Sequence, residues 1–267
     1  MLASNNIFAA KEPLTNFGIQ LWTVQQDMTK DAKGTLKALA SYGYKQIEGF
    51  EGKQGMFWGM TVADMKSYLN DLGMTMISSH CNINDKFEIK AANAANMGMK
   101  YLICPWLGPQ KTIDDYKKAA DNFNTRGEIC KKNGIRFTYH NHGYSFQMTD
   151  GQMPQDVMMD NTNPDLVDFE MDMYWVVTGG ADIKTYLKKY KNRWRLCHVK
   201  DRSKTAGATE QDASVIVGTG SIDYPSILPY AKKMGVEYFI VEQEKFEGST
   251  PMSSAEADAK YMMMLKV

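Results

Sequence analysis

Short apolar runs alternate along the chain with longer stretches of helical periodicity. The strand-like runs cover residues 17–23, 43–50, 74–80, 101–106, 136–142, 166–172, 194–200 and 238–244. The stretches between them predict helices at 35–42, 62–72, 87–96, 112–132, 183–189 and 224–234, with a last helix at 255–265. Strands that alternate with helices in this way indicate βαβ units and a parallel sheet.

The number and spacing of these units favour one closed barrel. Strands begin roughly every 27 to 44 residues, no linker-like break interrupts them, and the chain has 267 residues. We therefore predict a single (β/α)8 TIM barrel over residues 15–267. An open doubly wound sheet is the alternative, but no GxGxxG opens the first unit and no GxxxxGK[ST] occurs anywhere. The segment 201–221 is expected to be a long loop.

The first residues leave the compartment open. We expect residues 1–14 to be a disordered N-terminal stub, either the remnant of a trimmed export signal or an ordinary disordered start. Cytoplasm and periplasm both remain options, as does assembly into a homo-oligomer. The four cysteines form no CxxC pair and match no zinc-finger spacing.

Charge and hydropathy narrow the class of partner. Lys plus Arg and Asp plus Glu number 31 each, whereas proteins that grip phosphate backbones are normally basic. Nucleic acid is therefore not the expected partner. No apolar run approaches the ~20 residues of a membrane helix, so we expect no membrane span.

The candidate chemistry gathers at the ends of the predicted strands. Every histidine and two strong acids fall at or near such an end: His80, His140, His142, Asp172, His198 and Glu242. TIM-barrel active sites are built at the C-terminal ends of the strands, so these groups should converge. Imidazole and carboxylate ligands suit one divalent metal, with Mn²⁺, Co²⁺, Fe²⁺, Zn²⁺ and Mg²⁺ all open. Residues two apart share a strand face, which groups His140 with His142 and Glu170 with Asp172.

Aromatic residues near the same ends indicate a carbohydrate ligand. Trp22, Trp106 and Trp175 follow predicted strands, and their rings can stack on sugar C–H faces. We add His80 and Glu48 as candidate substrate-binding residues. The basic residues of segment 200–204 are diluted by Asp201 and have no glycine-rich nest, which favours an unphosphorylated sugar.

Several motifs, in order, resemble a known superfamily over about residues 15–266. They are FGIQLWTV (17–24), GIRFTYHNH (134–142), VDFEMD (167–172), CHVKD (197–201), VGTGSIDY (217–224) and FIVEQE (239–244). Together they resemble the sugar phosphate isomerase/epimerase superfamily, the xylose isomerase-like TIM barrels. Each motif is loose, and only their order and spacing are specific.

The resemblance implies a metal site and exposes one departure. The superfamily holds one divalent metal with Glu, Asp or Glu, His and Glu on strands five to eight, and Asp172, His198 and Glu242 match the last three. At the first position His140 replaces the Glu, with His142 two residues on, so either histidine is open as the ligand. Our working assignment gives the metal to His142, Asp172, His198 and Glu242, and proton transfer to Glu242, His140 and Lys200.

The resemblance also implies an isomerase or epimerase that moves a proton beside a sugar carbonyl through an enediolate. Elimination from a keto-sugar, keto-glycoside or inosose shares the first half of that reaction and is the alternative, as in the superfamily's inosose dehydratases. A carbohydrate-binding barrel without catalysis is a further option. A related DNA-repair endonuclease would need more metal ligands than four histidines allow.

Overall fold

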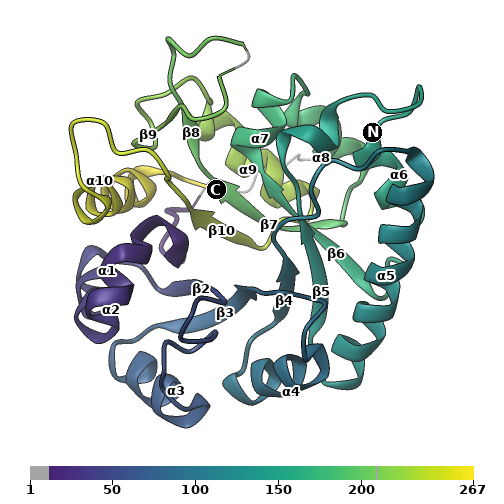
Figure 1. Cartoon of the computed structure of the whole chain (residues 1–267). Helices are drawn as coiled ribbons and strands as arrows, with labels where there is room; N and C mark the ends of the chain where they lie inside the picture. The colour runs from purple at the N-terminus through teal and green to yellow at the C-terminus, as the bar shows by residue number, and fades with distance from the viewer. Residues whose placement is uncertain (1–11, 209) are drawn as a thin grey trace, which may run out of the picture.

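Eight parallel strands form a closed barrel in a computed structural model that describes residues 12–208 and 210–267 (Figure 1). The strands are β1 (Gly18–Gln20), β2 (Gln46–Phe50), β3 (Thr75–His80), β4 (Tyr101–Cys104), β5 (Arg136–His140), β6 (Val167–Asp172), β7 (Trp194–Val199) and β10 (Tyr238–Val241). They follow chain order around the barrel, and β1 pairs with β10 to close it. The predicted TIM barrel is confirmed.

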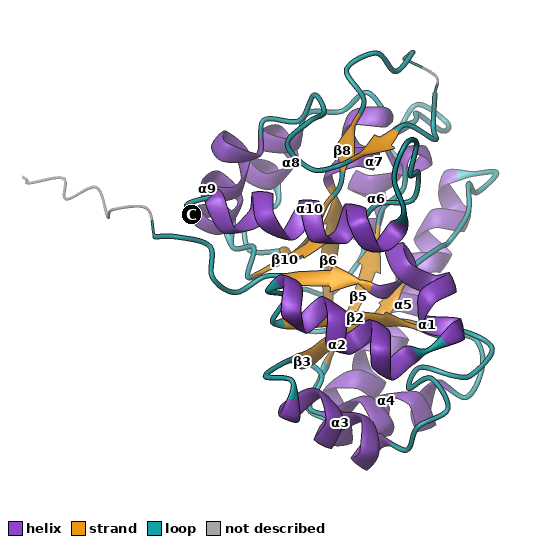
Figure 2. Cartoon of the chain, turned by 90° about the vertical axis from the view of Figure 1, so that its left-hand side faces the viewer, coloured by secondary structure: helices purple, strands orange, loops and turns teal. Residues whose placement is uncertain are grey.

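Helices surround this barrel on its outer face (Figure 2). They are α1 (Gln25–Lys30), α2 (Ala32–Tyr42), α3 (Val62–Asp71), α4 (Phe87–Met97), α5 (Ile113–Lys132), α6 (Pro154–Asp160), α7 (Met173–Thr178), α8 (Ile183–Lys189), α9 (Tyr224–Met234) and α10 (Pro251–Met264). Across the described ranges, no helix combines the length and the apolar character needed to cross a membrane.

Several short elements were absent from the sequence prediction. Helices α1, α6 and α7 were not expected, and the segment assigned to a loop carries a two-stranded antiparallel sheet of β8 (Asp201–Arg202) and β9 (Ser214–Val215). Strands β1 and β5 also end earlier than predicted, because the chain turns into a 3-10 helix soon after each one.

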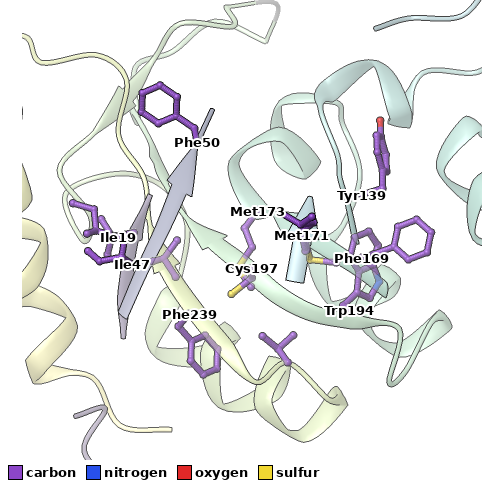
Figure 3. Packing of buried hydrophobic residues seen from close by; sticks show 14 of the residues in the cluster. Ile19, Ile47, Phe50, Tyr139, Phe169, Met171, Met173, Trp194, Cys197 and Phe239 are labelled. Carbon is purple, nitrogen blue, oxygen red and sulfur yellow. The ribbon is translucent and has the colours of Figure 1, made fainter. Parts of the chain in front are cut away.

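The core has two parts, because alternate residues of each strand face opposite sides. Cys197 and Val199 of β7 lie in the large cluster between strands and helices, where Phe169 packs edge-on against Trp194 with ring centroids 5.6 Å apart (Figure 3). Leu196 instead belongs to a small apolar cluster with Ile77, Tyr101, Ile103 and Ile240. His198, two residues after Leu196, shares its face of β7. The barrel interior therefore changes from apolar to polar toward the C-terminal ends of the strands.

The start of the described chain pairs with its end. The Glu12 and Leu14 N–H groups donate to the carbonyls of Val267 and Leu265, at 3.2 and 2.9 Å. Residues 12–14 are thus hydrogen-bonded to the barrel's last segment rather than being part of a disordered stub. The expectation for residues 1–11 lies outside the described residues.

Candidate metal centre and active site

Four side chains converge at the C-terminal ends of neighbouring strands. This upper group comprises His140, Asp172, His198 and Glu242, from β5, β6, β7 and the residue after β10. All four are buried, and one ligand atom of each lies within 4.8 Å of the others. His198 Nδ1 is 3.2 Å from Glu242 Oε2 and 3.2 Å from His140 Nε2, which is 3.5 Å from Asp172 Oδ2.

These atoms have the chemistry and spacing of a metal-ligand set. Metal–ligand bonds of ~2.0–2.2 Å in a tetrahedron place the ligand atoms about 3.3–3.6 Å apart, close to the separations observed here. Asp172 Oδ1 accepts the Trp175 N–H at 2.9 Å, whereas Asp172 Oδ2 is buried and has no hydrogen-bond partner among the described residues. A buried, unpartnered carboxylate oxygen beside two imidazole nitrogens fits a divalent cation.

A second set of polar groups lies next to the upper group, around the other nitrogen of the His198 ring. This lower group comprises Glu48, His80, Glu170 and His198. Glu48 Oε1 is 2.7 Å from His198 Nε2 and 3.1 Å from His80 Nε2, which is also 3.1 Å from Glu170 Oε2. Although burial opposes protonation, Glu48 and Glu170 raise the pKa of His80 to about 9. Burial, reinforced by Glu48, raises the pKa of Glu170 to about 7.

Lys200 is enclosed by carboxylates and aromatic rings. Its Nζ lies 3.3 Å from Glu242 Oε2, bonds Glu244, and sits 4.9 and 5.2 Å from the ring centroids of Tyr174 and Trp175. Burial opposes its charge, but Glu242 and its neighbours raise the pKa of Lys200 well above its ordinary value. Lys200 is therefore protonated and cannot remove a proton from a substrate. This argues against its use as a catalytic base.

A cavity of about 530 Å³ opens beside the upper group. It is lined by Trp22, Phe50, Glu51, Gly52, His80, Cys81, Asn82, Pro105, Trp106, His140, His142, Trp175, Glu242 and Glu244. Four of the five expected substrate-binding residues are among them, namely Trp22, His80, Trp106 and Trp175. Glu48 is not, because it is fully buried against His198. The structure thus separates Glu48 from the cavity where we expected it.

The two histidines at the end of β5 have different surroundings, His140 being the last residue of the strand and His142 lying two residues beyond it. His140 belongs to the upper group, whereas His142 belongs to neither group and packs against Trp106 and Trp175, with ring centroids 4.5 and 5.3 Å away. Burial lowers the pKa of His142 well below its ordinary value, so its ring is neutral. The geometry places His140, rather than His142, in the group of side chains that could hold a metal ion, and it places His142 in the cavity wall.

The glycine N–H groups of the segment 218–220 are already hydrogen-bonded to an acceptor within the protein. Asp201 Oδ2 accepts the N–H groups of Gly218 and Gly220, both at 2.9 Å, and Asp201 Oδ1 accepts that of Ile222 at 3.1 Å. These donors are therefore engaged by a carboxylate of the chain itself. In addition, the lining of the cavity includes no Lys or Arg from the part of the chain that the structure describes.

Glu170 belongs to the lower group, whereas the sequence analysis had grouped it with Asp172 on one strand face without assigning it to the site. Its signal was present, since Glu170 precedes Asp172 by two positions on the same face of β6. Glu51 and Glu244 also line the cavity and were not assigned to the site.

The protein has a closed parallel barrel with a buried cluster of His, Asp and Glu side chains at the strand ends. This combination places it in the class of TIM barrels whose buried cluster is typical of a divalent-metal site. The family described as xylose isomerase-like TIM barrel matches residues 36–264, and the chain belongs to this family. The resemblance noted from the motifs is thereby confirmed.

Curated relatives and solved structures agree with this membership. The chain is 29% identical over 163 residues to an inosose dehydratase of Clostridium perfringens, covering 56% of this chain and 54% of that protein. The chain thus spans about half the length of the curated relatives it matches. A sugar phosphate isomerase/epimerase from Parabacteroides distasonis superposes with a TM-score of 0.81, at 28% identity and 98% coverage of both chains. An IolI protein with a bound zinc atom, at 16% identity and a TM-score of 0.75, covering 92% of this chain and 95% of that one, shares the fold.

Proposed function

We propose that the protein is a divalent-metal-dependent isomerase or epimerase acting beside the carbonyl group of a sugar or keto-sugar. The observation that carries this proposal is the position of Glu242 and His140, which belong to the upper group and also line the cavity. A ligand in the cavity would therefore contact the metal-binding side chains directly.

The upper group would hold the metal through His140, Asp172, His198 and Glu242. A bound divalent ion supplies Lewis-acid polarisation of a carbonyl oxygen, worth several kcal/mol of charge stabilisation. Burial opposes ionisation of Glu242, but Lys200 and His198 lower the pKa of its carboxyl well below its ordinary value. Glu242 is therefore ionised in the folded protein.

We assign the proton-removing role to Glu242 and the proton-donating role to His80. The Glu242 carboxylate faces the cavity, and Lys200 behind it retains a compensating positive charge. His80 lines the same cavity and is protonated between Glu48 and Glu170. A base and an acid each contribute typically ~10²–10⁴-fold to such proton transfers.

The cavity wall supports an uncharged sugar as the ligand. The charged residues of the wall are acidic or are histidines, and three tryptophans add ring faces for stacking. The engagement of the segment 218–220 by Asp201 removes the backbone donors that could have cradled a phosphate.

Elimination from a keto-sugar or inosose is the second candidate. The curated relatives named inosose dehydratase favour it. Its first step is the same removal of a proton beside a carbonyl, followed by loss of a β-oxygen instead of return of the proton.

Solvent exchange tests the shared step. Protein purified without chelator should contain about one divalent metal per chain, and candidate keto-sugars incubated with it in D₂O should gain deuterium beside the carbonyl. Formation of an unsaturated product would favour elimination, whereas an epimeric or isomeric product would favour the first proposal. Absence of both metal and exchange across a broad panel would contradict both enzyme proposals and indicate a binding barrel.

A further inference from the structure

The two ring nitrogens of His198 face different polar groups. Its Nδ1 lies in the upper group, 3.2 Å from Glu242 Oε2 and 3.7 Å from Asp172 Oδ2. Its Nε2 faces the lower group, 2.7 Å from Glu48 Oε1 and 3.5 Å from Glu170 Oε2. The ring is fully buried, so its two nitrogens meet these two sets of side chains rather than solvent.

Glu48 is itself held in place by neighbouring side chains. Gln20 Nε2 donates to Glu48 Oε1 at 2.8 Å, and Ser78 Oγ donates to Glu48 Oε2 at 2.6 Å. The three side chains lie opposite one another on adjacent strands, because Gln20, Glu48 and Ser78 are register partners across β1, β2 and β3. These contacts fix the orientation of Glu48, which is fully buried and is not among the described residues that line the cavity.

We propose that Glu48 is a positioning residue for the metal-binding side chain of His198. A carboxylate that accepts the Nε2–H of an imidazole fixes the tautomer and leaves the Nδ1 lone pair for a metal. This inference rests on the metal-dependent function proposed above and adds a residue outside the cavity to the machinery of that function.

His198 is the histidine for which such support matters more. The other histidine of the upper group, His140, has a buried Nδ1 without a hydrogen-bond partner among the described residues. Asp172 is oriented independently, through the Trp175 N–H. Loss of Glu48 would therefore release the ring of His198, which Glu48 orients through the ring nitrogen that faces away from the upper group.

An alternative occupant of the lower group is a second metal ion, with the His198 ring bridging two ions. The spacing argues for a hydrogen bond instead. Two ligands of one tetrahedral ion lie about 3.3 Å apart for bonds of ~2.0–2.1 Å, whereas Glu48 Oε1 and His198 Nε2 are 2.7 Å apart. The donors from Gln20 and Ser78 also occupy the carboxylate of Glu48.

The test compares zinc binding by the wild-type protein and by Glu48→Gln, measured by competition with a chromophoric chelator. We expect one zinc per chain in both proteins and a Glu48→Gln affinity about 10–100-fold weaker. Glu237→Gln is the matched control, because Glu237 pairs with Arg195 at 3.0 Å at the N-terminal end of β10, and its zinc affinity should remain that of the wild type. If Glu48→Gln fails to fold, Ser78→Ala removes a single donor to Glu48 and should weaken zinc binding several-fold.

A second readout follows the proton itself. In ¹⁵N-labelled, zinc-loaded wild-type protein, His198 should show a protonated Nε2 and a metal-bound Nδ1. An unprotonated Nε2, two zinc ions per chain, or wild-type zinc affinity in Glu48→Gln would each overturn the positioning role while leaving the metal-dependent function intact. Failure of the wild-type protein to bind zinc or any other divalent ion would overturn both.

Discussion

His140, the last residue of β5, and His142, two positions further along the chain, have different surroundings. His140 Nε2 lies 3.2 Å from His198 Nδ1, whereas the His142 ring packs against Trp106 and Trp175. The two side chains should therefore make different contributions, His140 to metal binding and His142 to ligand binding.

Alanine substitutions separate these two contributions. His140→Ala removes a member of the upper group and should reduce metal affinity by roughly 100-fold or more, beyond the effect of losing an orienting neighbour. His142→Ala should retain the metal and raise KM for the sugar. Metal analysis of both variants, followed by steady-state kinetics, checks this prediction. Equal metal loss in the two variants would contradict it.

Glu242→Gln tests the base. The amide keeps the size of the side chain but cannot remove a proton, so kcat should fall by about 10²–10⁴-fold while the protein remains folded. The measurement is the rate of deuterium exchange together with a thermal unfolding curve. A variant with full exchange activity would show that another residue is the base.

At this scale the sequence predicted which residue types would gather but not how each one is oriented. The strand-end rule identified all four members of the upper group as candidates. It could not choose between His140 and His142, because the two-residue alternation applies only within a strand and β5 ends at His140. Nor could it show the burial of Glu48, since depth in a barrel depends on the stagger between strands.

At the scale of single elements, helix α7 shows that a local sequence pattern can predict the wrong secondary structure. Helix α7 consists of six residues rich in aromatic and β-branched types, a composition typical of strands. Asp172 caps this helix by accepting the Trp175 N–H, and the same carboxylate contributes to the upper group. The helix thus depends on its tertiary setting, which a local pattern does not contain.

The Asp201 carboxylate anchors the last part of the segment between β7 and α9. Asp201→Ala would leave the N–H groups of Gly218, Gly220 and Ile222 without their acceptor, at a cost of about 1–3 kcal/mol for each donor left buried. We expect faster amide hydrogen exchange in residues 214–222, measured by mass spectrometry. Asp212→Ala is the control, because Asp212 is exposed on the same segment and should leave exchange unchanged. Unaltered exchange in Asp201→Ala would contradict the anchoring role.

For the whole molecule, the alternation of strand and helix patterns was sufficient to predict the barrel. Each strand contributes one βα unit, so small errors in the predicted ends of strands and helices do not change the number of units. The packing of α10 against the segment after β9 was not predictable, because Asp258 and Val217 are 41 residues apart in the chain.

That packing makes the stability of the protein depend on pH. Burial raises the pKa of Asp258 to about 7, even though the Val217 N–H donates to its Oδ1. The folded state thus favours the neutral acid, so this stabilisation is complete below about pH 4 and is lost as pH rises through about 7.

Asp258→Asn mimics the neutral acid and should remove this dependence. Between about pH 4 and pH 8 the free energy of unfolding of the wild-type protein should fall by on the order of 3 kcal/mol more than that of the variant. Denaturant unfolding at both pH values gives the comparison. Parallel changes in the two proteins would show that Asp258 is ionised without penalty.

The pairing of residues 12–14 with the last three residues has a practical consequence for joining the protein to other objects. Pro13 and Lys266 form a bridge. Pro13 and Val267 line a hollow together with Glu237, which precedes β10 at the N-terminal end of that strand. The cavity opens at the opposite, C-terminal ends of the strands. A surface or a fused enzyme attached beside residues 265–267 would therefore lie at the end of the barrel away from the cavity and would leave the cavity entrance open.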